Sequence, residues 1–194
     1  MRRGGEGGRQ QQQRSGNGAE NVAAGRPRRR SALALAVVAL LFFSVPAVAL
    51  AAPKQTAVFD FEIYDTSGEA VAEDLPQRLR RVSDELRLLL AQAPDDYALV
   101  DLSPAAERID ALGNRYGCNG CEASIAVEFG ADVYVTGLIH KVSTLILVVR
   151  ITVRDADTRE VVARGVADIR GDNDRAWMHG VRWLVRNRIL PGRR

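Results

Sequence analysis

Beyond residue 51 the chain alternates between segments with a strand-like hydrophobic pattern and segments with a helical one. Residues 56–63 (TAVFDFEI) form a β-branched and aromatic run that a Thr-Ser-Gly turn ends, which predicts a strand. From residue 74 to Pro94, apolar residues recur every three or four positions with charged residues between them, which predicts a long amphipathic helix. Residues 97–102 (YALVDL) predict a second strand.

The second half of this region predicts two short helices, three strands and a last helix. Ser103 and Pro104 suit the N-cap and first turn of a helix that reaches about residue 112. A glycine-rich segment then leads to a helix over residues 121–129. The three strands are expected at 132–142, 145–155 and 160–169, joined by tight turns, and Asp172 or Asn173 is expected to cap a last helix that reaches Leu190.

The resulting order is β-α-β-α-α-β-β-β-α, an α/β (α+β) fold. Strands that are separated by helices need right-handed crossovers and pair in parallel, whereas strands joined by tight turns pair antiparallel. The sequence therefore predicts a mixed five-stranded sheet with the helices packed on it.

The first 51 residues differ in character from the rest. Residues 1–30 are rich in Gly, Gln and Arg and predict a disordered basic leader. The apolar run and small residues of 31–51 are typical of a signal-peptide core and cleavage site, with cleavage expected after Ala51. Residues 52–194 would then be a single mature α/β domain in the periplasm. The alternative is an uncleaved inner-membrane anchor with a periplasmic domain, because twenty apolar residues can span a bilayer.

Charge separates the leader from the domain. The whole chain carries a net charge of +3, but 8 arginines and only 2 acidic residues lie in residues 1–51. From Ala52 onward, 19 basic residues face 22 acidic ones, so the domain is acidic. Nucleic-acid binding needs a surplus of Lys and Arg on the folded domain and is therefore not expected. The expected partner is an envelope protein or a second copy of the chain, with no stable membrane insertion after signal cleavage.

Several motifs in order resemble known envelope proteins. TAVFDFE, YALVD, the FGADVYVTG segment at residues 129–137 and the RITVRDADTREVVARGVADI hairpin resemble the α/β domain of the curli secretion lipoprotein and the amino-terminal domain of the Tol translocation protein. The stretch from Gly117 to Glu122, LIHKVSTLIL and the tail from Asp168 to Trp177 resemble more closely a family of small secreted proteobacterial proteins of uncharacterised function.

The resemblance implies this fold and an envelope setting, but no activity. No cysteine lies near the cleavage site, where a lipoprotein would carry one. The Ser143-Thr144 link is too short for the membrane-spanning hairpins of the curli channel, so a pore is not expected.

Cys118 and Cys121 are the sharpest chemical feature of the sequence. In an oxidising compartment such a pair at the start of a helix forms a structural disulfide or serves thiol–disulfide exchange. The structural disulfide is favoured, because the pair follows a helix and a glycine-rich turn and no proline precedes a suitable strand. A zinc site would have to recruit His140 and His179 as further ligands.

Carboxylates are expected to gather where the first two strands end. Asp60 and Glu62 alternate onto one face of the first strand, and Asp101 ends the second. Ligands of open α/β sheets bind at this edge, and the three residues are candidates for a divalent cation site or for acid–base work. The opposing interpretation is a solvated strand end with helix-capping acids. No cofactor is expected.

The last helix carries two apolar stripes. Trp177, Gly180, Val181, Leu184 and Val185 form the stripe that docks the helix. Ala176, His179, Trp183 and Leu190 fall on the neighbouring stripe, beside arginines that include Arg182 and Arg186. The second stripe either extends the core or presents Trp183, His179, Arg182 and Arg186 to a protein partner.

These features favour a secreted periplasmic accessory protein that acts by protein–protein binding and is not an enzyme. Binding would use the terminal helix face or an edge strand of the hairpin sheet, by strand addition. One alternative is a thiol–disulfide or metal-dependent enzyme centred on Cys118 and Cys121, and another is a small-ligand binding module at the sheet's carboxyl edge.

Overall fold

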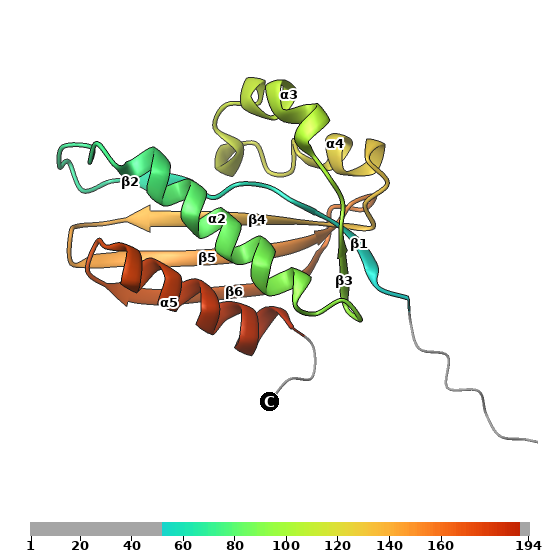
Figure 1. The fold of residues 1–194 in the computed structure, drawn as a ribbon. Coiled ribbons are helices and arrows are strands. Elements are labelled where there is room, and N and C mark those ends of the chain that lie inside the picture. The colour runs from blue at the N-terminus through green and yellow to red at the C-terminus, as the bar shows by residue number, and fades with distance from the viewer. Residues whose placement is uncertain (1–51, 191–194) are drawn as a thin grey trace, which may run out of the picture. The chain divides into compact units, whose positions relative to one another are not determined.

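The computed structural model describes residues 52–190 (Figure 1). The predicted leader at 1–30 and signal peptide at 31–51 lie outside the described residues. The six strands are β1 (Lys54–Val58), β2 (Glu62–Asp65), β3 (Tyr97–Leu99), β4 (Val133–Lys141), β5 (Ile146–Asp155) and β6 (Val161–Arg170). The helices are α2 (Leu75–Ala91), α3 (Ala106–Ala111), α4 (Ala123–Glu128) and α5 (Asp174–Leu184), with short helical turns η1 (Ser103–Ala105), η2 (Arg115–Gly117) and η3 (Val185–Ile189).

The strands form one mixed sheet in the order β3-β1-β4-β5-β6, and β2 pairs with the far part of β4. β1 runs parallel to β3 and β4, β2 runs parallel to β4, and β5 is antiparallel to both β4 and β6. The predicted mixed α/β fold is therefore confirmed. The strand count differs, because the expected strand at 56–63 is two strands, β1 and β2.

A one-residue bulge divides β1 from β2. Val58 pairs with Val135 and Glu62 with Leu138, so four steps along β1–β2 correspond to three steps along β4. The extra residue reverses which face the following side chains occupy. Phe59 accordingly packs in one hydrophobic cluster and Phe61 in another, on opposite faces of the sheet.

The larger core lies between one face of the sheet and the helices α2 and α5 (Figure 1). Its largest fully buried side chains include Trp177 and Leu184 of α5 and Leu86 and Leu90 of α2. Asn173 caps α5 as expected, because its side-chain oxygen accepts a hydrogen bond of 3.0 Å from the Ala176 backbone N–H.

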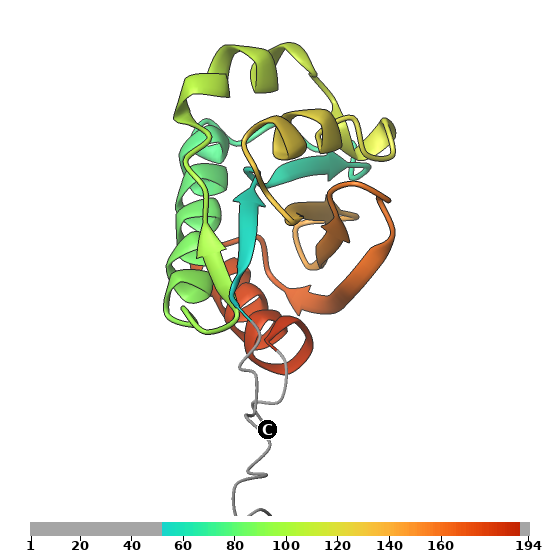
Figure 2. The same cartoon turned by 90° about the vertical axis from the view of Figure 1, so that its right-hand side faces the viewer.

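The opposite face of the sheet is covered only in part. The segment containing α3 and α4 lies at one end of the sheet (Figure 2). It packs a second, smaller core against β1 and the start of β4, around Phe59 and Tyr134. No helix of residues 52–190 packs over the same face of β5 and β6, whose helix contacts come from α5 and η3 on the other face. This part of the sheet is called the open face below.

A buried ion network holds the hairpin end of the sheet to both helices. The Lys141 Nζ lies 3.0 Å from a Glu69 oxygen and 3.1 Å from an Asp172 oxygen. The other Asp172 oxygen lies 2.7 Å from the Arg78 guanidinium, which also stacks over the Trp177 ring. Burial alone would lower the pKa of Lys141, but hydrogen bonds to Glu69 and Asp172 raise it.

Within the described range, no helix combines the length and the apolar character that crossing a membrane requires.

Substitution of Gly137 on β4 by alanine tests the packing at the bulge. A Cβ added at Gly137 would lie 2.5 Å from carbons of the Phe61 ring, so Gly137→Ala must displace that ring from the core. We expect the free energy of unfolding to fall by about 1–3 kcal/mol, measured by urea denaturation. Gly117→Ala is the control, because nothing lies within 4 Å of its added Cβ. Equal stability of the two variants would contradict the packing described.

Candidate functional site

Cys118 and Cys121 form the predicted disulfide, in the loop between η2 and α4. Within residues 52–190, the one group of three potential metal ligands is Cys118, Cys121 and Glu122, and the disulfide uses both sulfur atoms. His140 is not part of this group and contacts the Thr66 hydroxyl and the Tyr64 ring. The four-ligand zinc arrangement with His140 and His179 is not formed.

The disulfide closes a loop that forms one wall of a pocket. Asn119 and Gly120, between the two cysteines, have positive φ angles of 49° and 102°. Gly120 lies so close to the Tyr134 hydroxyl that an added Cβ would approach the oxygen to 2.9 Å. The Asn119 side-chain oxygen accepts a hydrogen bond of 3.4 Å from the Arg154 guanidinium. The loop therefore connects the disulfide to side chains of β4 and β5.

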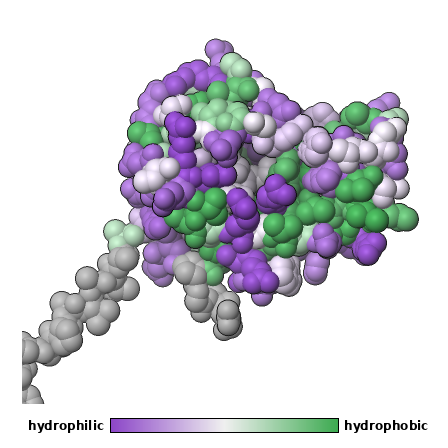
Figure 3. Space-filling model, turned by 180° about the vertical axis from the view of Figure 1, so that it is seen from behind, coloured by the Kyte–Doolittle hydropathy of each residue, from purple (hydrophilic) through white to green (hydrophobic). Residues whose placement is uncertain are grey.

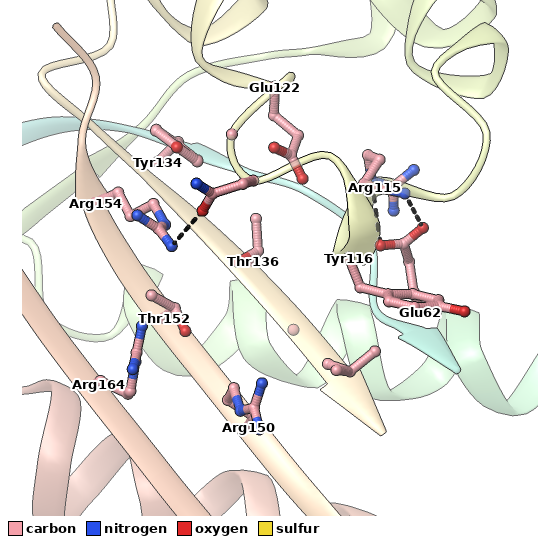
Figure 4. A pocket seen from close by; sticks show the side chains of 14 residues that line it. Glu62, Arg115, Tyr116, Glu122, Tyr134, Thr136, Arg150, Thr152, Arg154 and Arg164 are labelled. Atoms are coloured by element: carbon pink, nitrogen blue, oxygen red, sulfur yellow. Dashed lines mark hydrogen bonds and ion pairs between the residues drawn. The ribbon is translucent and has the colours of Figure 1, made fainter. Parts of the chain in front are cut away.

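The pocket has a volume of about 120 Å³ and lies on the open face (Figure 4). Its polar lining comes from η2, the disulfide loop and strands β2, β4, β5 and β6, and consists of Glu62, Arg115, Tyr116, Asn119, Glu122, Tyr134, Thr136, Arg150, Thr152, Arg154 and Arg164. Glu62 accepts a hydrogen bond of 2.9 Å from the Arg115 backbone N–H, which ties η2 to β2.

Four polar side chains of this pocket are buried: Arg115, Glu122, Tyr134 and Thr152. Glu122 is 3% exposed, and burial raises the pKa of its carboxyl. Tyr134 is fully buried, which raises the pKa of its phenol, and among the described residues its hydroxyl has no hydrogen-bond partner. A buried hydroxyl without a partner is costly and calls for a functional or structural explanation.

The carboxylates predicted at the strand ends do not gather as a group of three. The bulge directs Asp60 toward α2, where one oxygen lies 2.6 Å from the Arg87 guanidinium, and Glu62 toward Arg115 on the opposite face. The expectation that Asp60 and Glu62 share a face is therefore wrong. Asp101 accepts hydrogen bonds from the Ser103 backbone and hydroxyl, which lower the pKa of Asp101.

Asp60 and Asp101 do line a common depression of about 500 Å³ at the carboxyl edge of β1 and β3. Each of these two carboxylates already has a partner, Arg87 for Asp60 and Ser103 for Asp101. Their proposed role as a cation site or an acid–base pair stays a prediction.

The docking stripe of α5 is buried as predicted, whereas the second stripe is divided. Ala176 and Leu190 pack against the core, but His179 is exposed and Trp183 keeps 38% of its surface exposed. Trp183 stacks with the Arg188 guanidinium at 5.7 Å from the ring centroid. Trp183 is therefore outside the core.

The candidate partner-binding residues, three on α5 and Arg186 on η3, do not all contact the same neighbouring element. Arg182 pairs with Glu85 of α2 at 2.5 Å, and Arg186 donates a hydrogen bond to the Arg182 carbonyl. His179 instead lines a shallow depression together with residues 168–170 of β6. The Arg188 side chain, whose guanidinium stacks on the Trp183 ring, lies against Gly165 of β6. Trp183 and His179 thus flank the last strand of the sheet.

β6 is a ten-residue strand at the edge of the sheet. The Gly171 backbone N–H donates a hydrogen bond of 3.2 Å to the Leu145 carbonyl and therefore points toward β5. Because the direction of the backbone groups alternates along an antiparallel strand, the N–H and C=O groups of residues 164, 166, 168 and 170 point away from β5. Val161, Val162 and Val166 are exposed on this strand. Figure 3 shows hydrophobic residues gathered over part of the face opposite α2 and α5, next to hydrophilic ones.

Comparisons with known proteins identify a family. The model of the family DUF3280, described as "Protein of unknown function (DUF2380)", matches residues 54–189. No curated protein matches the chain.

Three solved structures are similar to this chain. The LpoB C-terminal domain from Salmonella enterica is 15% identical, with 69% of this chain and 91% of that chain covered and a TM-score of 0.41. The PelC dodecamer from Paraburkholderia phytofirmans is 11% identical, with 70% and 88% covered and a TM-score of 0.42. Lipoprotein GNA1162 from Neisseria meningitidis is 12% identical, with 63% and 84% covered and a TM-score of 0.45.

The disulfide can be tested by removing it. We expect no reactive thiols in the native protein and two after reduction, because both cysteines are bonded. A Cys118→Ala/Cys121→Ala variant should fold but lose about 2 kcal/mol of stability, since the closed loop is short. Thiol titration and thermal melting measure both effects, and a reductant should change the melting of the wild type but not of the variant. A variant as stable as the wild type would contradict a structural role.

Glu122→Gln tests the burial of the carboxyl. Because the pKa of Glu122 is higher in the folded state than in the unfolded chain, its ionisation destabilises the fold as pH rises above the unfolded value. The Gln variant should therefore be more stable than the wild type at pH 7, and this difference should vanish below pH ~4. Urea denaturation across this pH range measures it. A difference that stays constant with pH would contradict the raised pKa.

Proposed function

The chain belongs to the DUF3280 family, whose function is unknown, and from this premise we propose that it is an exported accessory protein of the cell envelope that binds another protein and is not an enzyme. The family match confirms the prediction of an uncharacterised family. The finer resemblance to the curli secretion lipoprotein and the Tol translocation protein supports the envelope setting, as does the signal-peptide pattern of residues 31–51. On this proposal residues 52–194 act as one mature domain in the periplasm.

The observation that carries the proposal is the unpaired outer edge of β6. In the described part of the chain β6 pairs with β5 alone, and four of its residues direct backbone donors and acceptors outward. Such an edge is a template for an added strand, and proteins usually protect it with short length, proline or a covering element. β6 has ten residues and no proline. An extended segment of the partner would add to this edge by β-augmentation.

The surroundings of β6 define the chemistry of the partner. Trp183 and His179 flank the strand on the α5 side, and Val166 lies on the open face, 49% exposed. Within residues 52–190, none of the arginines along this rim pairs with a carboxylate: Arg164, Arg170, Arg175 and Arg188. An extended acidic segment with apolar side chains is complementary to this rim. A second copy of the chain would be the alternative occupant.

Val166→Pro separates strand addition from side-chain contact. Proline removes the outward N–H of Val166 but leaves the hydrogen bonds to β5, which the neighbouring residues make. A photo-crosslinker at Val162 should capture one envelope protein in cells, and Val166→Pro should lower that yield at least tenfold. Val166→Thr keeps both the N–H and the β-branched shape and should retain most of the yield.

Trp183→Ala should weaken the same cross-link while the melting temperature changes by no more than about 2 °C, because Trp183 lies outside the core. An unchanged cross-link in a folded Val166→Pro variant would overturn strand addition at β6. A cross-link between two copies of the chain would replace the partner with self-association.

A further inference from the structure

The pocket on the open face concentrates positive charge. The residues Arg150, Thr152 and Arg154 alternate along β5 onto the same face, and Arg164 lies directly opposite Thr152 on β6. Figure 4 shows the three arginines along one side of the pocket, across from Glu62 and Arg115. Like charges on neighbouring positions of a sheet are destabilising unless something compensates them.

None of these three guanidinium groups forms a salt bridge in the described part of the chain, although the Glu122 carboxyl of the same pocket is close enough to Arg154 for an electrostatic attraction. Within residues 52–190 no carboxylate lies within 4.0 Å of Arg150, Arg154 or Arg164. Glu62 is engaged by Arg115, whose guanidinium also donates a hydrogen bond of 2.9 Å to the Asp60 carbonyl.

Arg154 is held in place by neutral partners. Its guanidinium donates a hydrogen bond of 2.8 Å to the Arg159 carbonyl and one to the Asn119 side chain. The loop closed by the disulfide therefore orients a charged group that makes no salt bridge within the described residues. Preorganised donors of this kind are the usual means of binding an anionic oxygen group.

The wall of the pocket provides further donors. The Tyr134 side chain belongs to the pocket lining, and its buried hydroxyl has no partner among the described residues. The hydroxyls of Thr136 and Thr152 line the same pocket from β4 and β5. A volume of about 120 Å³ is several times what one water molecule needs, so a small polar group fits whereas a large cofactor does not.

We propose that this pocket binds the anionic oxygen group, carboxylate or phosphate, of a small ligand, with Arg150, Arg154 and Arg164 as the recognising cations. A guanidinium presents a planar pair of N–H donors that matches either group, and the tyrosine and threonine hydroxyls complete its coordination. The site lies on the open face and needs no partner strand at the β6 edge. The pocket shares Arg164 with the rim beside β6, but its binding of a small anion does not require the proposed protein-binding function.

The test is a titration of the mature domain with inorganic phosphate and, separately, with acetate. Two-dimensional NMR at constant ionic strength in a buffer without phosphate follows the backbone signals of Asn119, Gly120 and Thr136. We expect saturable shifts of these signals with at least one anion. The anion with the lower Kd identifies the group, phosphate or carboxylate.

Matched variants locate the site. Arg150→Gln and Arg164→Gln should each raise the Kd about tenfold or more, the loss expected for one charge-assisted contact. Arg170→Gln removes the same charge from β6 outside the pocket and should change the Kd less than twofold. Tyr134→Phe should raise the Kd several-fold without loss of stability, because the hydroxyl has no internal partner to lose.

Three results would overturn the proposal. The first is the absence of saturable shifts with both anions, and the second is an equal loss of affinity in Arg170→Gln and Arg164→Gln, which indicates a diffuse charge effect. The third is an unchanged Kd in both pocket arginine variants, once circular dichroism has shown that they are folded.

Discussion

The contact between Phe61 and Gly137 determines how the two faces of the sheet are built. One extra residue between β1 and β2 places Phe61 on the face covered by α2 and α5, although Phe59, two residues earlier, packs under α4. The Phe61 ring lies where a side chain of residue 137 would be, so only glycine leaves room for it. Without the bulge, Phe61 would leave the larger core, and a core vacancy of that size costs several kcal/mol.

The same reversal places one polar residue, Glu62, in the pocket of the open face. It directs Glu62 away from α2 and toward η2, where it accepts the backbone N–H of Arg115. η2 leads directly into the disulfide loop, and that loop contacts Tyr134 and Arg154 through Gly120 and Asn119. A packing constraint at one end of β2 is thereby linked to the shape of a pocket formed with β4 and β5.

Local pattern accounts for what the sequence could predict. The periodicity of α2, the cap at Asn173 and the tight turn around Asp157 each depend on a few neighbouring residues, and the CxxC spacing suits a disulfide across one short turn. The bulge left no such signal, because a strand with large apolar residues on both faces keeps its pattern when the register shifts by one.

The pocket was missed for a different reason. Its lining spans residues 62 to 164 and depends on which strands are neighbours. Arg150 and Arg154 are four positions apart and so fall on the same face of a strand, and combined with the hairpin register this spacing indicates a basic face.

The distribution of charge connects the open face and the β6 edge. The domain from Ala52 onward has more acidic than basic residues, yet many of its acids are used in ion pairs around α2 and the start of α5, such as Asp172 with Arg78 and Asp174 with Arg81. The arginines of β5 and β6 keep their charge unpaired in the described part of the chain. An acidic protein therefore presents a positive face, and charged clefts of this kind raise the local concentration of oppositely charged ligands. Because α2 and α5 bury the other face, this positive face is the one that stays accessible to both an acidic strand and a small anion.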